Sequence, residues 1–256
     1  MTQFVFGAGD FYGVPLYDAS GNAIANPTPV KVGTMQEMSL DFSADIKEAY
    51  GQYSFAVAVA RGKTKLSGKF KGLQINGNTL SGLFFGNGLA AGTLMAAYSD
   101  TTGASIPATP FQITVAPPGS GVWANDLGVI DSNGVAMTAV ASAPATGQYS
   151  VGAGGVYTFA AADTGKQVFI NYAYTATNAS AKKIAVTNLP MGYAPTFKSY
   201  MKTTYQGKNA LVVLYSTISS KLALLGTKLD DYSAQEIDFS GQANASGQVC
   251  DIYVQE

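Results

Sequence analysis

Hydrophobic and polar residues alternate along much of the chain, and this pattern predicts half-buried β-strands. The clearest example is residues 37–47, "EMSLDFSADIK", in which every second side chain from Met38 to Ile46 is apolar and shares one face. The opposite face carries the polar residues Glu37, Ser39, Asp41, Ser43 and Asp45. We therefore expect a strand with one core side and one acidic side.

A second alternating stretch, residues 60–72 ("ARGKTKLSGKFKG"), is basic on its polar side. It holds the only arginine and a group of lysines: Arg61, Lys63, Lys65, Lys69 and Lys71. Between the two stretches, residues 50–62 ("YGQYSFAVAVARG") place Phe55, Val57 and Val59 at alternate positions. The pattern predicts a meander of three strands.

Other segments predict further strands and few helices. Turn sequences at 18–23, 131–136, 205–210 and 244–249 join extended apolar runs, and we expect hairpins over 195–219 and 236–256. One short helix is expected over residues 78–86 ("NTLSGLFFG"), with Asn78 or Thr79 as N-cap and Gly86 as its end. Residues 219–231 fit either a strand pair or a second helical turn.

Composition changes near residue 105, where four prolines fall within "SIPATPFQITVAPPGSGVWAND", and again at 177–183 ("TNASAKK"). The enclosed residues 107–178 contain strand patterns of their own. We therefore expect an inserted all-β domain over 107–178, and a discontinuous all-β domain built from 1–106 and 179–256.

The composition excludes several kinds of chemistry. A formal net charge of −1 over 256 residues argues against a dedicated nucleic-acid or anionic-membrane binder. Without any histidine, Ser-His-Asp and Cys-His catalysis is ruled out, and the single Cys250 precludes an internal disulfide.

The glycine clusters at 7–13 and 152–155 lack phosphate-loop spacing. The carboxylate pairs Asp230/Asp231 and Glu236/Asp238 lack calcium-loop spacing.

We accordingly expect no catalytic residues, no metal, no cofactor and no enzymatic activity. The opening residues "MTQFVFGAG" do not resemble a secretion signal, and no run of about 20 apolar residues predicts a membrane span. The basic stripe at 61–71 has two interpretations: it binds phosphates, or it pairs with the acids at 37–45 within a sheet or between subunits. Cross-strand pairs of this kind contribute about 0.2–1 kcal/mol each, and we favour the structural interpretation.

Three long segments resemble the major tail tube proteins of long-tailed bacteriophages: 29–86 ("PVKVGTMQEMSLDF…NTLSGLFFG"), 147–175 ("GQYSVGAGGVYTF…YAYT") and 228–256 ("KLDDYSAQEIDF…IYVQE"). The resemblance implies a β-sandwich with a short helix, assembled as hexameric rings that stack into a tube for genome passage. It also implies that residues 107–178 form an immunoglobulin-like decoration on the tube exterior.

The same resemblance implies homo-oligomer contacts, tape-measure and terminator proteins as partners, and DNA that passes without specific binding. It implies no membrane contact, assembly in the bacterial cytoplasm and a final place in the virion tail. If residues 37–47 line the channel, then Glu37, Asp41 and Asp45 repel DNA phosphates, and the basic strand faces away from the DNA. The alternatives are another virion β-sandwich, such as a capsid decoration or tail terminator, and a carbohydrate-binding module.

Overall fold

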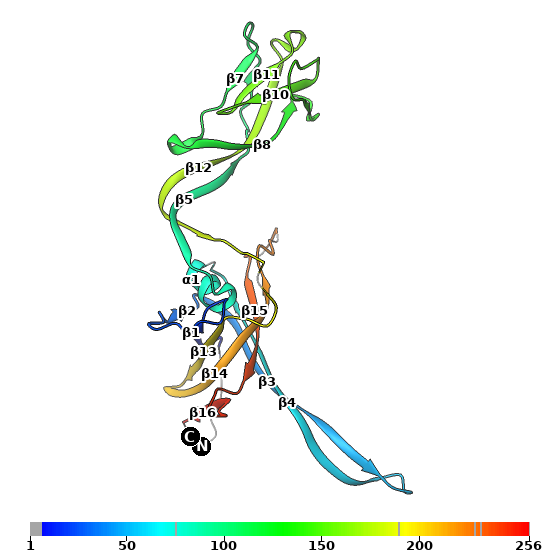
Figure 1. Cartoon of the computed structure of the whole chain (residues 1–256), viewed down its shortest axis with the longest axis vertical. Helices are drawn as coiled ribbons and strands as arrows, with labels where there is room; N and C mark the ends of the chain where they lie inside the picture. The colour runs from blue at the N-terminus through cyan, green and yellow to red at the C-terminus, as the bar shows by residue number, and fades with distance from the viewer. Residues whose placement is uncertain (1–6, 75, 189, 228, 231, 256) are drawn as a thin grey trace. The chain divides into compact units, whose positions relative to one another are not determined.

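The computed structural model describes residues 7–74, 76–188, 190–227, 229–230 and 232–255 (Figure 1). Strands make up 56% of the chain and helices 6%, so the predicted all-β class is confirmed. The chain divides into two compact units, residues 1–89 with 184–256 (unit 1) and residues 90–183 (unit 2). Unit 2 is longer at both ends than the expected 107–178 insertion, because β5 (Leu89–Tyr98) and the end of β12 (Gln167–Ile184) lie side by side in one sheet.

One eight-stranded sheet forms the framework of unit 1. Its strands are β1 (Asp10–Tyr17), β2 (Val30–Lys31), β3 (Met35–Tyr50), β4 (Ala56–Gly72), β13 (Thr196–Tyr205), β14 (Lys208–Ala223), β15 (Gln235–Gln242) and β16 (Cys250–Val254). They follow the order β2-β1-β13-β14-β15-β4-β3, and β16 pairs with β14 beyond the end of β15. The long strand β3 is therefore an edge strand.

The apolar face of this sheet curls around its own core. The ring centroids of Phe11 on β1 and Phe70 on β4 lie 4.2 Å apart, although three strands separate β1 from β4 in the sheet. Phe239 lies 5.8 Å from Phe11 and is also fully buried. A flat sheet would hold these rings far apart, so the contact requires strong curvature.

A short helical segment closes one side of this core. It consists of α1 (Gly77–Thr79) and a π-helical turn, η1 (Leu80–Phe85), and it ends at Gly86 with φ of 65°. The helix is thus confirmed, but its N-cap is Asn76 rather than Asn78 or Thr79, because the Asn76 side chain accepts a hydrogen bond from the Asn78 N–H. Leu83 is fully buried and packs where any side chain at Gly13 would stand.

The strands of unit 1 agree with the sequence predictions only in part. Residues 196–223 form the expected hairpin of β13 and β14. The predicted three-stranded meander is a two-stranded hairpin, because residues 56–72 form one continuous strand, β4, rather than two. The predicted terminal hairpin is also wrong: β15 and β16 both pair with β14 and not with each other. In the ambiguous segment 219–231, the strand β14 continues to Ala223, while residues 228 and 231 lie outside the described residues.

Unit 2 contains two four-stranded sheets. One has the order β7 (Gln112–Thr114), β11 (Val156–Phe159), β10 (Gln148–Gly152) and β9 (Thr138–Ala139). The other contains β5, β12, β6 (Ala104–Ser105) and β8 (Val122–Asp131). Buried residues from both sheets share one core: Ile106, Val129, Tyr149, Tyr157, Phe159, Val168, Ile170 and Tyr172. Beside this core, the Asp126 carboxylate accepts hydrogen bonds from the Tyr149 hydroxyl at 2.6 Å and the Tyr157 hydroxyl at 3.0 Å.

Candidate functional site

The acidic and basic rows predicted from the sequence lie on one face of the unit 1 sheet. In the β3–β4 pair, Glu37 stands opposite Lys71, and Ser43 stands opposite Lys65. Residues that face each other across an antiparallel pair share a face, because pleating alternates together along both strands. The acidic row and the lysines of the basic stripe therefore share one face of this sheet. A surface formed by this face of the sheet therefore contains both the acids of β3 and the lysines of β4.

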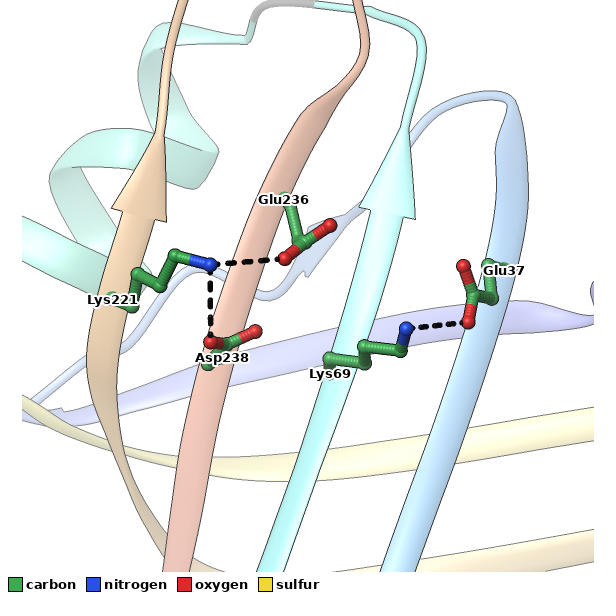
Figure 2. A network of polar contacts seen from close by, with 5 residues as sticks. All are labelled: Glu37, Lys69, Lys221, Glu236 and Asp238. Atoms are coloured by element: carbon green, nitrogen blue, oxygen red, sulfur yellow. Dashed lines mark hydrogen bonds and ion pairs between the residues drawn. The ribbon is translucent and has the colours of Figure 1, made fainter.

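One ion pair links these two rows directly. The Lys69 ammonium lies 2.7 Å from a Glu37 carboxylate oxygen, diagonally across the two strands (Figure 2). The hydrogen bond from Lys69 and its positive charge lower the pKa of Glu37, with a smaller contribution from the charge of Lys71. Reciprocally, the hydrogen bond to Glu37 raises the pKa of Lys69. For Lys69, the predicted pairing of the basic stripe within the sheet is thus observed.

The alternation of charge extends to two more strands. On β15, Glu236 stands opposite Lys71 and Asp238 stands opposite Lys69. The Lys221 ammonium on β14 lies 3.2 Å from Glu236 and 3.7 Å from Asp238 (Figure 2). The rows on β14, β15, β4 and β3 are therefore positive, negative, positive and negative in turn. We call this four-strand surface the charged face.

The sequence pattern also contains a signal for the charged residues of β14 and β15. Residues 235–242 alternate in the same way as β3: Ile237 and Phe239 are fully buried on one side, and Glu236 and Asp238 are half-buried on the other. Their spacing as a carboxylate pair excludes a calcium loop but does not reveal a lysine on the neighbouring strand. Their shared lysine, Lys221, lies in the segment whose secondary structure was ambiguous.

Beyond the charged face, the β3–β4 hairpin continues without flanking strands. Strand β15 pairs with β4 only from Leu66 to Gly72, so the Ala56–Lys65 edge of β4 has no partner strand among the described residues. The whole outer edge of β3 is likewise unpaired in the described part of the chain. We call residues 43–65 the arm, and Figure 1 shows it leading away from the rest of the sheet.

Large apolar side chains on the arm are open to solvent. The exposed fractions are 57% for Ile46, 84% for Phe55, 69% for Val57 and 64% for Val59. The side of the arm with Ile46 continues the face that carries Leu66 and the core further along the sheet. Contiguous exposed apolar surface of this kind marks contact sites in soluble proteins, because exposing it to water is unfavourable in free energy and contact with a partner removes that cost.

A β-bulge changes the placement of two predicted site residues. Ala44 pairs with Thr64, whereas Ile46 pairs with Arg61, so β4 contains one extra residue there. Because a bulge shifts the alternation by one residue, Arg61 lies on the apolar side with Ile46 rather than with the lysines. Asp45 lies beside the bulge, where a Cβ on Gly62 would be 3.3 Å from the Asp45 Cβ.

The described residues contain no group of three His, Cys, Asp or Glu side chains placed to hold a metal ion. A hollow of about 420 Å³ at the root of the arm is lined by uncharged residues: Phe42, Thr64, Leu66, Gly241, Gln242, Ala243, Val249 and Cys250. Of the helices in the described ranges, none has the length and apolar character needed to cross a bilayer.

Comparisons with protein-family models and with curated proteins found no match.

Proposed function

We propose that this protein is a structural subunit of a phage tail tube, and that it assembles into hexameric rings that stack around a channel for genome delivery. The observation that carries this proposal is the arm. Among the described residues, both of its strand edges lack a partner, and a row of its apolar side chains is exposed to water in an isolated molecule. Association of identical copies would cover these surfaces.

Closed assembly also accounts for the length of the open edge. Strand β3 extends over 16 residues at the edge of its sheet and contains no proline. Edges of this length invite further strand pairing, and closure into a ring removes them. If the sheet of each subunit continues into the next, the backbone N–H and C=O groups on the outer edge of β3 form hydrogen bonds with the neighbouring subunit. In a closed ring no subunit is left with a free edge, as it would be at the end of a fibre.

The charged face is compatible with a channel wall through which DNA slides. Its lysines are opposed by acids: Lys69 contacts Glu37, and Lys221 contacts Glu236 and Asp238. A lysine held by a carboxylate offers less attraction to a DNA phosphate than a free one, because the two charges cancel at a distance. In the proposed tube, Glu37, Asp41 and Asp45 face the lumen together with the lysines, and the wall is close to neutral.

Electron microscopy tests the proposal directly. Purified protein should form rings or hollow tubes in negative stain, and light scattering should show an oligomer in solution. The matched control replaces residues 45–63 by Asn-Gly. This joins Ala44 to Thr64, which already face each other, through a two-residue hairpin turn. The shortened protein should fold and remain monomeric.

Other results would contradict the proposal. A full-length protein that stays monomeric at high concentration rules out the tube. Binding of the monomer to empty capsids would favour a decoration protein, and retention on glycan resins would favour a carbohydrate-binding module.

A further inference from the structure

We propose that neighbouring copies join edge to edge through their arms, with β3 of one copy beside the Ala56–Lys65 edge of β4 in the next. This inference rests on the proposed function and specifies which surfaces meet in a ring. The partner is a second copy of this chain.

The backbone of the arm supplies two edges that fit each other. Strands β3 and β4 are antiparallel, and over the arm each has one unpaired edge in the described structure. When a second arm lies alongside in the same orientation, its β4 runs opposite to β3 of the first. The new pair is therefore antiparallel, and the sheet continues as β4-β3-β4-β3 from copy to copy.

The charges select this arrangement over a symmetric one. The outer edge strand β3 carries Glu37, Asp41 and Asp45 against one lysine on its polar side, Lys47. The free edge of β4 carries Lys63 and Lys65. A head-to-tail contact places the acidic row beside a basic row and extends the alternation already present on β14, β15, β4 and β3. A symmetric contact of β3 with β3 would bring two acidic rows together.

Strand β15 determines how far neighbouring arms can overlap. Because β15 already occupies β4 from Leu66 to Gly72, an incoming β3 reaches only the Ala56–Lys65 segment. Within one copy, Glu37 and Asp41 stand opposite Lys71 and Ser67, so they reach the Ala56–Lys65 segment of the next copy only when successive copies are staggered along the strands. Closure of a sheet into a barrel requires such a stagger. The exposed side chains of Ile46, Val57 and Val59 then lie next to those of the adjacent arm.

A charge-swap experiment tests this pairing. The first variant, Asp41→Lys/Asp45→Lys, makes both outer edges of the β3–β4 hairpin basic, and the second, Lys63→Glu/Lys65→Glu, makes both acidic. Each variant alone sets like charges against each other between copies, and its assembly concentration should rise at least about tenfold. A one-to-one mixture places basic edges beside acidic edges all round a ring, so the mixture should assemble near the wild-type concentration. A chain with all four substitutions should also assemble.

Circular dichroism first confirms that each variant is folded, and sedimentation and electron microscopy then measure assembly. Rescue of each variant by 0.5 M salt, which shortens electrostatic range to a few ångströms, is a further expected result. Two outcomes overturn the pairing while leaving the proposed tube intact: both variants assemble alone like wild type, or the mixture of folded variants fails while wild type forms tubes. Failure of the wild-type chain to assemble overturns the proposed function and the pairing with it.

Discussion

Replacing Phe11 by alanine tests whether the curled sheet, rather than the hairpins alone, holds unit 1 together. The Phe11 side chain is fully buried, and its ring lies within 6.5 Å of the rings of Phe70, Phe197 and Phe239. These partners come from three other strands that are spread across the sheet. Removal of one ring therefore opens a cavity where the two sides of the curl meet.

The expected cost can be bounded from the burial. Phe-to-Ala substitutions in protein cores cost about 3–5 kcal/mol. Since stabilities of whole domains are about 5–15 kcal/mol, the loss is a large share of the total. With a denaturant slope of about 2 kcal/mol per molar urea, the unfolding midpoint of unit 1 should fall by about 2 M.

Phe55→Ala is the matched control, because it is the same substitution at a side chain that is 84% exposed on the arm. It should change the unfolding free energy by no more than about 0.5 kcal/mol. Under the proposed function it should nevertheless weaken assembly, since it removes apolar contact area from the arm. The two substitutions thus separate folding of the subunit from association between subunits.

The assay uses two probes, because the chain has two units. The only tryptophan, Trp123, belongs to unit 2, so its fluorescence serves as an internal reference. Backbone circular dichroism reports both units. A shift of less than about 0.5 M urea for Phe11→Ala in the circular dichroism transition would refute the argument that the curl buries an essential core.

Three further predictions follow from particular contacts. The carboxyl group of Glu37 should titrate below its ordinary pKa of 4.5 in an NMR titration, and Lys69→Met should return it toward that value. The contribution of this contact to stability should be fully present above pH 4.5 and lost as the pH falls through the lowered pKa. Tyr149→Phe should destabilise unit 2 by about 1–3 kcal/mol, measured by Trp123 fluorescence, because Asp126 loses a hydrogen-bond donor at a partly buried site. Gly86→Ala should lower the melting temperature, since the backbone there has φ of 65° and a Cβ would stand 2.6 Å from the Ala19 nitrogen, whereas Gly88→Ala, with open space around it, should not.

Local pattern was sufficient to identify the strand faces. The alternation in residues 37–47 correctly placed Met38 and Leu40 against the core, but Phe42 and Ile46 on the same side of β3 are exposed. The turn at Gln206-Gly207 correctly predicted the β13–β14 hairpin. The short helix was recognisable because Leu80 and Leu83 are spaced for one face and Gly86 ends it. Each of these features depends on neighbours within a few residues, which a single sequence displays.

Strand partners depend on distant residues and were not predictable in the same way. The terminal segment 236–256 reads as a hairpin because a turn separates two alternating runs. Strand β14, however, is 16 residues long and offers one edge to both β15 and β16, one after the other. Pairing with this long strand buries Ile237 and Phe239 of β15 in the core, and this burial outweighs the shorter loop closure of a local hairpin.

The bulge in the arm shows that one extra residue can reverse the face on which the following side chains lie, so that the alternation in the sequence no longer indicates their side of the sheet. Arg61 reads as the first member of the basic stripe, yet the extra residue in β4 places it opposite Ile46 on the apolar side. The basic residues of the stripe therefore lie on two different faces: the lysines are on the charged face, and Arg61 is among the exposed apolar side chains. A guanidinium can stack on apolar and aromatic groups while keeping its hydrogen bonds, which a lysine ammonium does less readily. Under the proposed function, Arg61→Lys should accordingly weaken assembly more than Lys63→Arg, and equal assembly concentrations for the two variants would show that the face occupied by residue 61 does not matter.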